Sequence, residues 1–151
     1  TVMDQFKGTV YRQTMFAEFE LAMGKMAESG QALTADALCQ KYHALNKLYF
    51  GPDMVSDDQI ALEWARIPHF FYNYYVFQYA TGFSAAVAIA KRILKEGAPA
   101  VADYKKFLSG GCSTDPISLL KIAGVDMSSP EPVNSALALF GELVDEMEQL
   151  V

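Results

Sequence analysis

The sequence is poor in cysteine and has a deficit of positive charge. Cys39 and Cys112 are the only two cysteines among 151 residues, and their separation does not match the spacing of a metal site. This usage is typical of a reduced setting, so we predict a cytoplasmic protein. Lys and Arg total 12 against 18 Asp and Glu, which gives a net charge of −6. A nucleic-acid surface needs a basic face, so we expect no nucleic-acid partner.

The sequence also lacks long apolar runs and the common catalytic motifs. A membrane helix needs about 18 apolar residues in succession, whereas residues 79–89 are too short and are followed by Lys91 and Arg92. We therefore expect no membrane partner. H-E-x-x-H, C-x-x-C and G-x-S-x-G are absent, which predicts no metal ligands within the chain and argues against a serine hydrolase. The chain opens on Thr1 without a leader pattern, as expected for a piece of a longer protein.

What the sequence does contain is helical periodicity. With 52% hydrophobic and 20% charged residues, the composition is globular, and the length suits one domain or part of one. Turn and capping signals divide the chain into helices over 4–29, from Thr34 to Gly51, from a Ser56/Gln59 capping box to Pro68 and from the aromatic segment to Gly97. Further helices are expected over 100–108 and 117–122, and a last one that Ser129 and Pro130 open runs to the C-terminus. Asp115 or Thr114 is the expected cap at 117. No strand pattern stands out, so we predict an all-α assembly of six or seven helices forming a single unit over residues 1–151.

Residues 68–83, PHFFYNYYVFQYATGF, are unusually rich in aromatic rings. On a helix, Tyr72, Tyr75 and Tyr79 would fall within about 60° of one another, with His69 just upstream. A buried phenol needs a hydrogen-bond partner, so this row indicates a wet cavity or a ligand, and the remaining rings are assigned to the core. The alternative is that the tyrosines straddle the core with their hydroxyls in water.

Three further residues are candidates with weaker signals. Arg12 falls on the apolar stripe of the first helix, where a charge needs a partner; pairing with a carboxylate of another helix is favoured over contact with a ligand. Gly110 and Gly111 lack the lysine and hydroxyl of a P-loop and are more typical of a turn between helices.

Several ordered blocks of the chain resemble the C-terminal part of oligoendopeptidase F-type zinc peptidases, which are relatives of thimet oligopeptidase. These blocks are FKGTVYRQTMFAEFE, ARIPHFFYNYYVFQYATGFSAA, LSGGCSTDPISLLKIAGVDMSSPEP and ALALFGELVDEMEQL. The resemblance implies a helical body with a channel that hydrolyses short peptides, using zinc held by H-E-x-x-H and a downstream glutamate. Because those ligands are absent here, it also implies that zinc is bound by an upstream catalytic half of the same protein, and that this chain alone is inactive.

The resemblance assigns roles to individual residues. Tyr75, then Tyr72, and His69 are the catalytic candidates, as donors to the substrate and to the developing oxyanion. Tyr79, Arg12, Gly110 and Gly111 are the substrate-binding candidates. The competing hypothesis is a non-enzymatic helical module for protein–protein interaction, whose aromatic face docks a partner helix.

Overall fold

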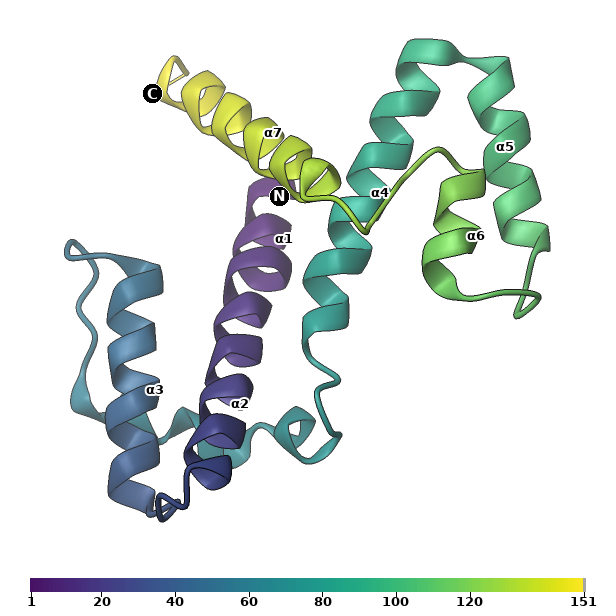
Figure 1. Cartoon of the computed structure of the whole chain (residues 1–151). Coiled ribbons are helices and arrows are strands. Elements are labelled where there is room, and N and C mark those ends of the chain that lie inside the picture. The colour runs from purple at the N-terminus through teal and green to yellow at the C-terminus, as the bar shows by residue number, and fades with distance from the viewer. Residues whose placement is uncertain (151) are drawn as a thin grey trace. The chain divides into compact units, whose positions relative to one another are not determined.

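A computed structural model describes residues 1–150, which are helical and contain no strand (Figure 1). This confirms the all-α prediction. The elements are α1 (Val2–Gln5), the π-helix η1 (Phe6–Tyr11), α2 (Arg12–Glu28), α3 (Ala35–Phe50), the 3-10 helices η2 (Asp58–Arg66) and η3 (Pro68–Phe71), α4 (Phe77–Glu96), α5 (Ala98–Ser109), α6 (Pro116–Ile122) and α7 (Glu131–Glu148). The seven α-helices agree with the predicted number.

Contacts group these residues into two compact units. One is Lys7–Ala80, and the other joins residues 1–6 to residues 81–150. The boundary at Ala80 falls after the first turn of α4. The single unit predicted over residues 1–151 stays a prediction, and each unit is described by itself below.

Most helix ends follow from the local sequence. The Thr34 hydroxyl caps α3 by accepting the N–H of Ala37, and Gly51 ends that helix at a positive φ of 79°. Asp115 caps α6 by accepting the N–H of Ser118. The capping box predicted at Ser56 is wrong: Asp57 caps η2 instead, because the Ser56 hydroxyl donates to Asn46 Oδ1 at 2.7 Å.

The unit Lys7–Ala80 is built around the face of α2 that meets α3 and η2. Its core contains Met15, Phe16, Phe19, Leu38, Tyr42, Leu45, Ile67 and Val76. The ring of Phe19 lies 5.2 Å from that of Tyr42 and 5.2 Å from that of Phe70, edge-on in both cases. Phe70 therefore anchors the start of the aromatic segment in the core.

The continuous helix predicted through the aromatic segment is wrong. The helix η3 ends at Phe71, residues 72–74 form a bend, and α4 begins only at Phe77. Asn73 and Tyr74 have φ values of 52° and 60°, in the left-handed region that an α-helix of L-residues does not use. Helical periodicity could not reveal this break, because the spacing of the aromatic residues fits a helix equally well.

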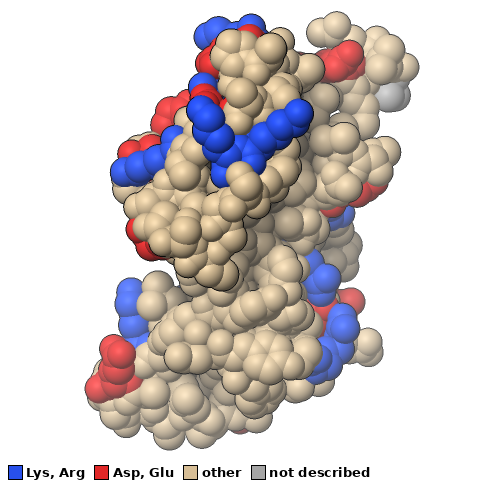
Figure 2. All heavy atoms as spheres, turned by 90° about the vertical axis from the view of Figure 1, so that its right-hand side faces the viewer, with Lys and Arg blue, Asp and Glu red and all other residues tan. Residues whose placement is uncertain are grey.

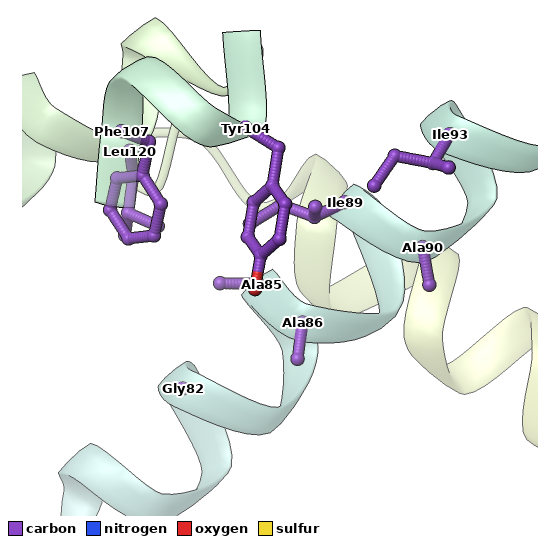
Figure 3. Close-up of a pocket in the computed structure, with 9 residues that line it drawn as sticks. All are labelled: Gly82, Ala85, Ala86, Ile89, Ala90, Ile93, Tyr104, Phe107 and Leu120. Atoms are coloured by element: carbon purple, nitrogen blue, oxygen red, sulfur yellow. The ribbon is translucent and has the colours of Figure 1, made fainter. Parts of the chain in front are cut away.

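The second unit has its own core. Ala85 and Ile89 of α4 pack with Ala123 and Val125, and Phe6 lies 4.9 Å from Phe83 and 5.2 Å from Phe140 between ring centroids. A hollow of about 430 Å³ opens beside this core, and the Tyr104 ring extends from α5 toward Ala85 in it (Figure 3). Its lining is apolar.

Arg92 ties three segments of this second unit together. Its guanidinium donates to the Ala123 carbonyl at 2.8 Å, to Asp103 at 2.9 Å and to Glu96 at 3.0 Å. The hydrogen bond to Asp103 first, and then the charge and hydrogen bond of Glu96, raise the pKa of Arg92. The residue after Ala123 is Gly124, which has a φ of 79°, and a Cβ on it would lie 2.5 Å from Arg92 Nη1. The turn therefore requires glycine both for its backbone and for its closeness to the guanidinium.

The surface is mixed in charge. Figure 2 shows one face, on which Lys and Arg side chains lie near Asp and Glu side chains and leave broad uncharged areas. Within residues 1–150, no helix is both long enough and apolar enough to span a bilayer.

Candidate functional site

His69, Tyr72, Tyr75 and Tyr79, here called the tyrosine cluster, come together in the unit Lys7–Ala80. The ring of His69 lies 5.9 Å from that of Tyr75, in a stacked orientation, and 5.7 Å from that of Tyr79, edge-on. Tyr75 lies 5.5 Å from Tyr79 and 6.0 Å from Tyr72 between centroids. The four residues predicted to share a site thus do so, although the bend, rather than one helix face, brings them together.

A hydrogen-bonded chain runs through the cluster. His69 Nε2 lies 3.1 Å from the Tyr79 hydroxyl. A hydrogen bond with Tyr75, and then burial, raise the pKa of the Tyr79 phenol above its ordinary 10.0. A hydrogen bond thus joins the hydroxyls of Tyr79 and Tyr75.

The cluster is open to solvent. Tyr72 is 59% exposed and Tyr75 is 38% exposed, and the neighbouring Phe71 is 80% exposed. The prediction that the remaining rings of the segment form core is wrong for Phe71, and also for Tyr74 and Phe77, which are 44% and 51% exposed. Phe71 and Tyr74 lie outside the core because the chain leaves it after Phe70 and returns to it only at the fully buried Val76.

Two residues that sequence reasoning missed contact the bend. The buried Glu20 of α2 accepts the backbone N–H of Tyr74 at 2.7 Å through Oε1. The Tyr74 hydroxyl lies directly against Gly24, one turn further along α2, where a Cβ would overlap it. A carboxylate on the apolar face of α2 was the available signal, since a buried acid needs a donor.

Arg12 has the carboxylate partner that was predicted for it. Its Nη2 pairs with Glu63 Oε1 of η2, and its guanidinium lies over the Phe16 ring at 4.9 Å. Glu63 is nearly buried and also accepts from Arg66 at 2.5 Å and from the Tyr42 hydroxyl at 2.6 Å. These contacts give Arg12 a role in the fold. Its substrate-binding role stays a prediction.

Gly110 and Gly111 belong to the second unit and follow α5. A Cβ at Gly110 would lie 2.5 Å from Leu119 Cδ2, so its absence lets α5 and α6 approach closely. Gly111 has φ 55° and lines an apolar hollow of about 530 Å³ with Cys112 and Pro116. The turn between helices is therefore present, and the substrate-binding role of both glycines stays a prediction.

Residues 1–150 do not bring three His, Cys, Asp or Glu side chains together in a way that suits a metal ion. The described residues therefore do not supply the zinc site that the resemblance implies.

The fold and the cluster define an all-α chain that presents a row of hydrogen-bonding aromatic residues to solvent. Comparison with known proteins gives the family: residues 2–139 match the model of peptidase family M3, and the chain belongs to that family. The resemblance to oligoendopeptidase F-type peptidases is thereby confirmed.

Individual relatives agree with this assignment. The chain is 57% identical over 150 residues to oligopeptidase PepF of Bacillus subtilis and 46% identical over 149 residues to group B oligopeptidase PepB of Streptococcus agalactiae, and covers 22% and 25% of those proteins. Among solved structures, oligoendopeptidase-F from Enterococcus faecium matches 99% of this chain with a TM-score of 0.95 and 48% identity, over 29% of its own chain. The chain thus spans about a quarter of the length of its relatives.

Proposed function

We propose that this chain forms part of the substrate channel of a zinc-dependent oligopeptidase, and that the tyrosine cluster donates hydrogen bonds to the peptide and to the oxyanion. The observation that carries the proposal is the chain of contacts from His69 through Tyr79 to Tyr75, a residue that is 38% exposed. Membership of peptidase family M3 supports a peptidase over the non-enzymatic interaction module. The same proposal includes short peptides as substrates, the rest of the parent protein as a partner, and a cytoplasmic location.

The chemistry needs a donor at the place where negative charge develops. When water adds to the carbonyl carbon of a peptide bond, the carbonyl oxygen takes up the electron pair of the C=O double bond. A donor already positioned there stabilises the transition state more than the substrate. Tyr75 suits this role because its phenol can donate a hydrogen bond, and because its ring packs against those of His69, Tyr72 and Tyr79.

Tyr72 and Tyr79 then have different parts. Tyr72 is the most exposed member of the cluster and lies edge-on to Tyr75, so it contacts bound peptide near the reacting carbonyl. Tyr79 is partly buried against the core and bonded to His69, so it orients Tyr75. His69 holds the Tyr79 hydroxyl through Nε2.

The test is Tyr75→Phe in the full-length peptidase that contains this chain, assayed with a short fluorogenic peptide. Loss of one oxyanion donor typically lowers kcat by about 10²- to 10³-fold, and zinc content should stay the same. Tyr49→Phe is the matched control, because the Tyr49 hydroxyl donates to Glu18 outside the cluster and should leave turnover unchanged. Normal turnover in Tyr75→Phe would refute the oxyanion role.

A further inference from the structure

The bend that carries the tyrosines is held in an unfavourable backbone conformation. Residues 71–75, here called the tyrosine segment, leave the core after Phe70 and return at Val76. Within the segment, Asn73 and Tyr74 both have left-handed φ values of 52° and 60°. Asn tolerates this region, but a bulky residue such as Tyr rarely adopts it. Something outside the segment must therefore stabilise the conformation.

Helix α2 supplies that support from one face. Phe16, Glu20 and Gly24 are spaced four residues apart and so lie on the same side of α2. Phe16 contacts the ring of Phe70 at 5.6 Å, Glu20 accepts the N–H of Tyr74, and Gly24 leaves room for the Tyr74 hydroxyl. The same face thus contacts the residue before the segment, the backbone of the segment and the Tyr74 hydroxyl.

The hydrogen bond of Glu20 acts at the strained residue itself. The Oε1 to N distance is 2.7 Å, and Glu20 is only 6% exposed. A carboxylate acceptor makes a strong hydrogen bond to a backbone N–H, particularly where water is excluded. Through this bond the Tyr74 N–H is held against α2, and the ring of the next residue, Tyr75, lies against those of His69 and Tyr72.

We propose that Glu20 is a positioning residue for the tyrosine cluster: it fixes the left-handed Tyr74 and thereby the place of Tyr75. Gly24 is the second part of this device, since a side chain there would displace the Tyr74 ring. Glu20 does not touch the reacting atoms. The inference rests on the proposed function only in its kinetic consequence, because the effect on the backbone is independent of what the cluster binds.

The first test follows the backbone in the full-length protein, by hydrogen–deuterium exchange of a peptide that contains the Tyr74 amide. Glu20→Ala should make that amide exchange about tenfold faster, as expected for the loss of one hydrogen bond. Glu20→Gln keeps an acceptor oxygen and should restore slow exchange. Glu18→Ala, which removes the carboxylate that Tyr49 contacts, is the control and should leave the Tyr74 amide unaffected. Unchanged exchange in Glu20→Ala would overturn the proposal.

The second test is kinetic. Glu20→Ala should lower kcat for a short peptide by about ten- to hundredfold, since small displacements of a positioned donor have effects of this order, and Glu20→Gln should recover most of it. If Glu20→Ala does not fold, Gly24→Ala decides the matter, because it displaces the Tyr74 ring while α2 keeps its acceptor. A Gly24→Ala enzyme with wild-type kcat and exchange would contradict the inference.

The two proposals fail in different ways. Altered exchange in Glu20→Ala together with normal turnover in Tyr75→Phe would refute the oxyanion role and keep Glu20 as the support of the segment. Normal exchange in Glu20→Ala together with slow turnover in Tyr75→Phe would refute the role of Glu20 and keep the oxyanion role of Tyr75.

Discussion

Removing one buried hydroxyl should measurably destabilise the unit Lys7–Ala80. Tyr42 is fully buried, and its hydroxyl donates to Glu63 Oε2 at 2.6 Å, where the Glu63 side chain is 8% exposed. A hydrogen bond to a charged group contributes about 1.5–3 kcal/mol, and Tyr42→Phe leaves the aromatic packing with Phe19 in place. We therefore expect the free energy of unfolding to fall by about 2 kcal/mol.

The same chemical change at Tyr49 provides the control. The Tyr49 hydroxyl donates to Glu18 at 2.9 Å, but this pair is exposed, so water can replace the lost bond. Tyr49→Phe should therefore cost less than about 1 kcal/mol. Comparing the two variants separates the effect of burial from that of deleting a phenol oxygen.

The assay is urea unfolding followed by the fluorescence of Trp64, the single tryptophan, whose ring lies 6.4 Å from Phe19. In a Glu63→Gln background the cost of Tyr42→Phe should shrink to about 1 kcal/mol, the value of a neutral hydrogen bond. Equal losses in Tyr42→Phe and Tyr49→Phe, or an undiminished loss in the Glu63→Gln background, would refute the reasoning.

Two further predictions concern pH and a turn. Burial, and then the hydrogen bond to Glu63, raise the pKa of Tyr42 above 10.0 in the folded state. The stability that results is complete below pH 10 and is lost as the pH rises above it. The wild type should therefore lose stability more steeply above pH 10 than Tyr42→Phe does, and parallel curves of stability against pH would contradict this. In thermal melts, Gly124→Ala should lower stability more than Gly30→Ala. Both glycines have φ near 78°, but only a Cβ at Gly124 would meet Arg92. Equal losses of about 1 kcal/mol each, from backbone strain alone, would show that the Arg92 contact does not contribute to the loss.

The parts of the fold that the sequence predicted depend on local chemistry. Thr34 and Asp115 cap helices because their own side chains reach N–H groups three residues on. Gly51 and Gly97 end helices because both have a positive φ. The composition of the tyrosine cluster was likewise recognised from side-chain chemistry, since a row of phenols and a histidine has more hydrogen-bonding capacity than a core requires.

The parts that were missed depend on contacts between residues far apart in the chain. Glu20 and Tyr74 are separated by 54 positions, and no periodicity connects them. Likewise, no periodicity identifies Glu63 as the carboxylate that pairs with Arg12, because the two residues are 51 positions apart. The bend at Asn73 was hidden because nearby tertiary contacts override the helical spacing of the aromatic residues.

Phe19 connects the stability of this unit to the position of the tyrosine segment, and it also allows the two to be separated. Its ring contacts both Tyr42 and Phe70, and it precedes Glu20 on α2. Tyr42→Phe keeps the ring that Phe19 packs against, so it should lower the stability of the whole unit without loosening the segment beforehand. Glu20→Ala acts on the segment directly. Local opening should therefore make the Tyr74 amide exchange faster in Glu20→Ala and leave its exchange unchanged in Tyr42→Phe. The reason is that the segment is held by its own contacts with α2, on a core that is already folded.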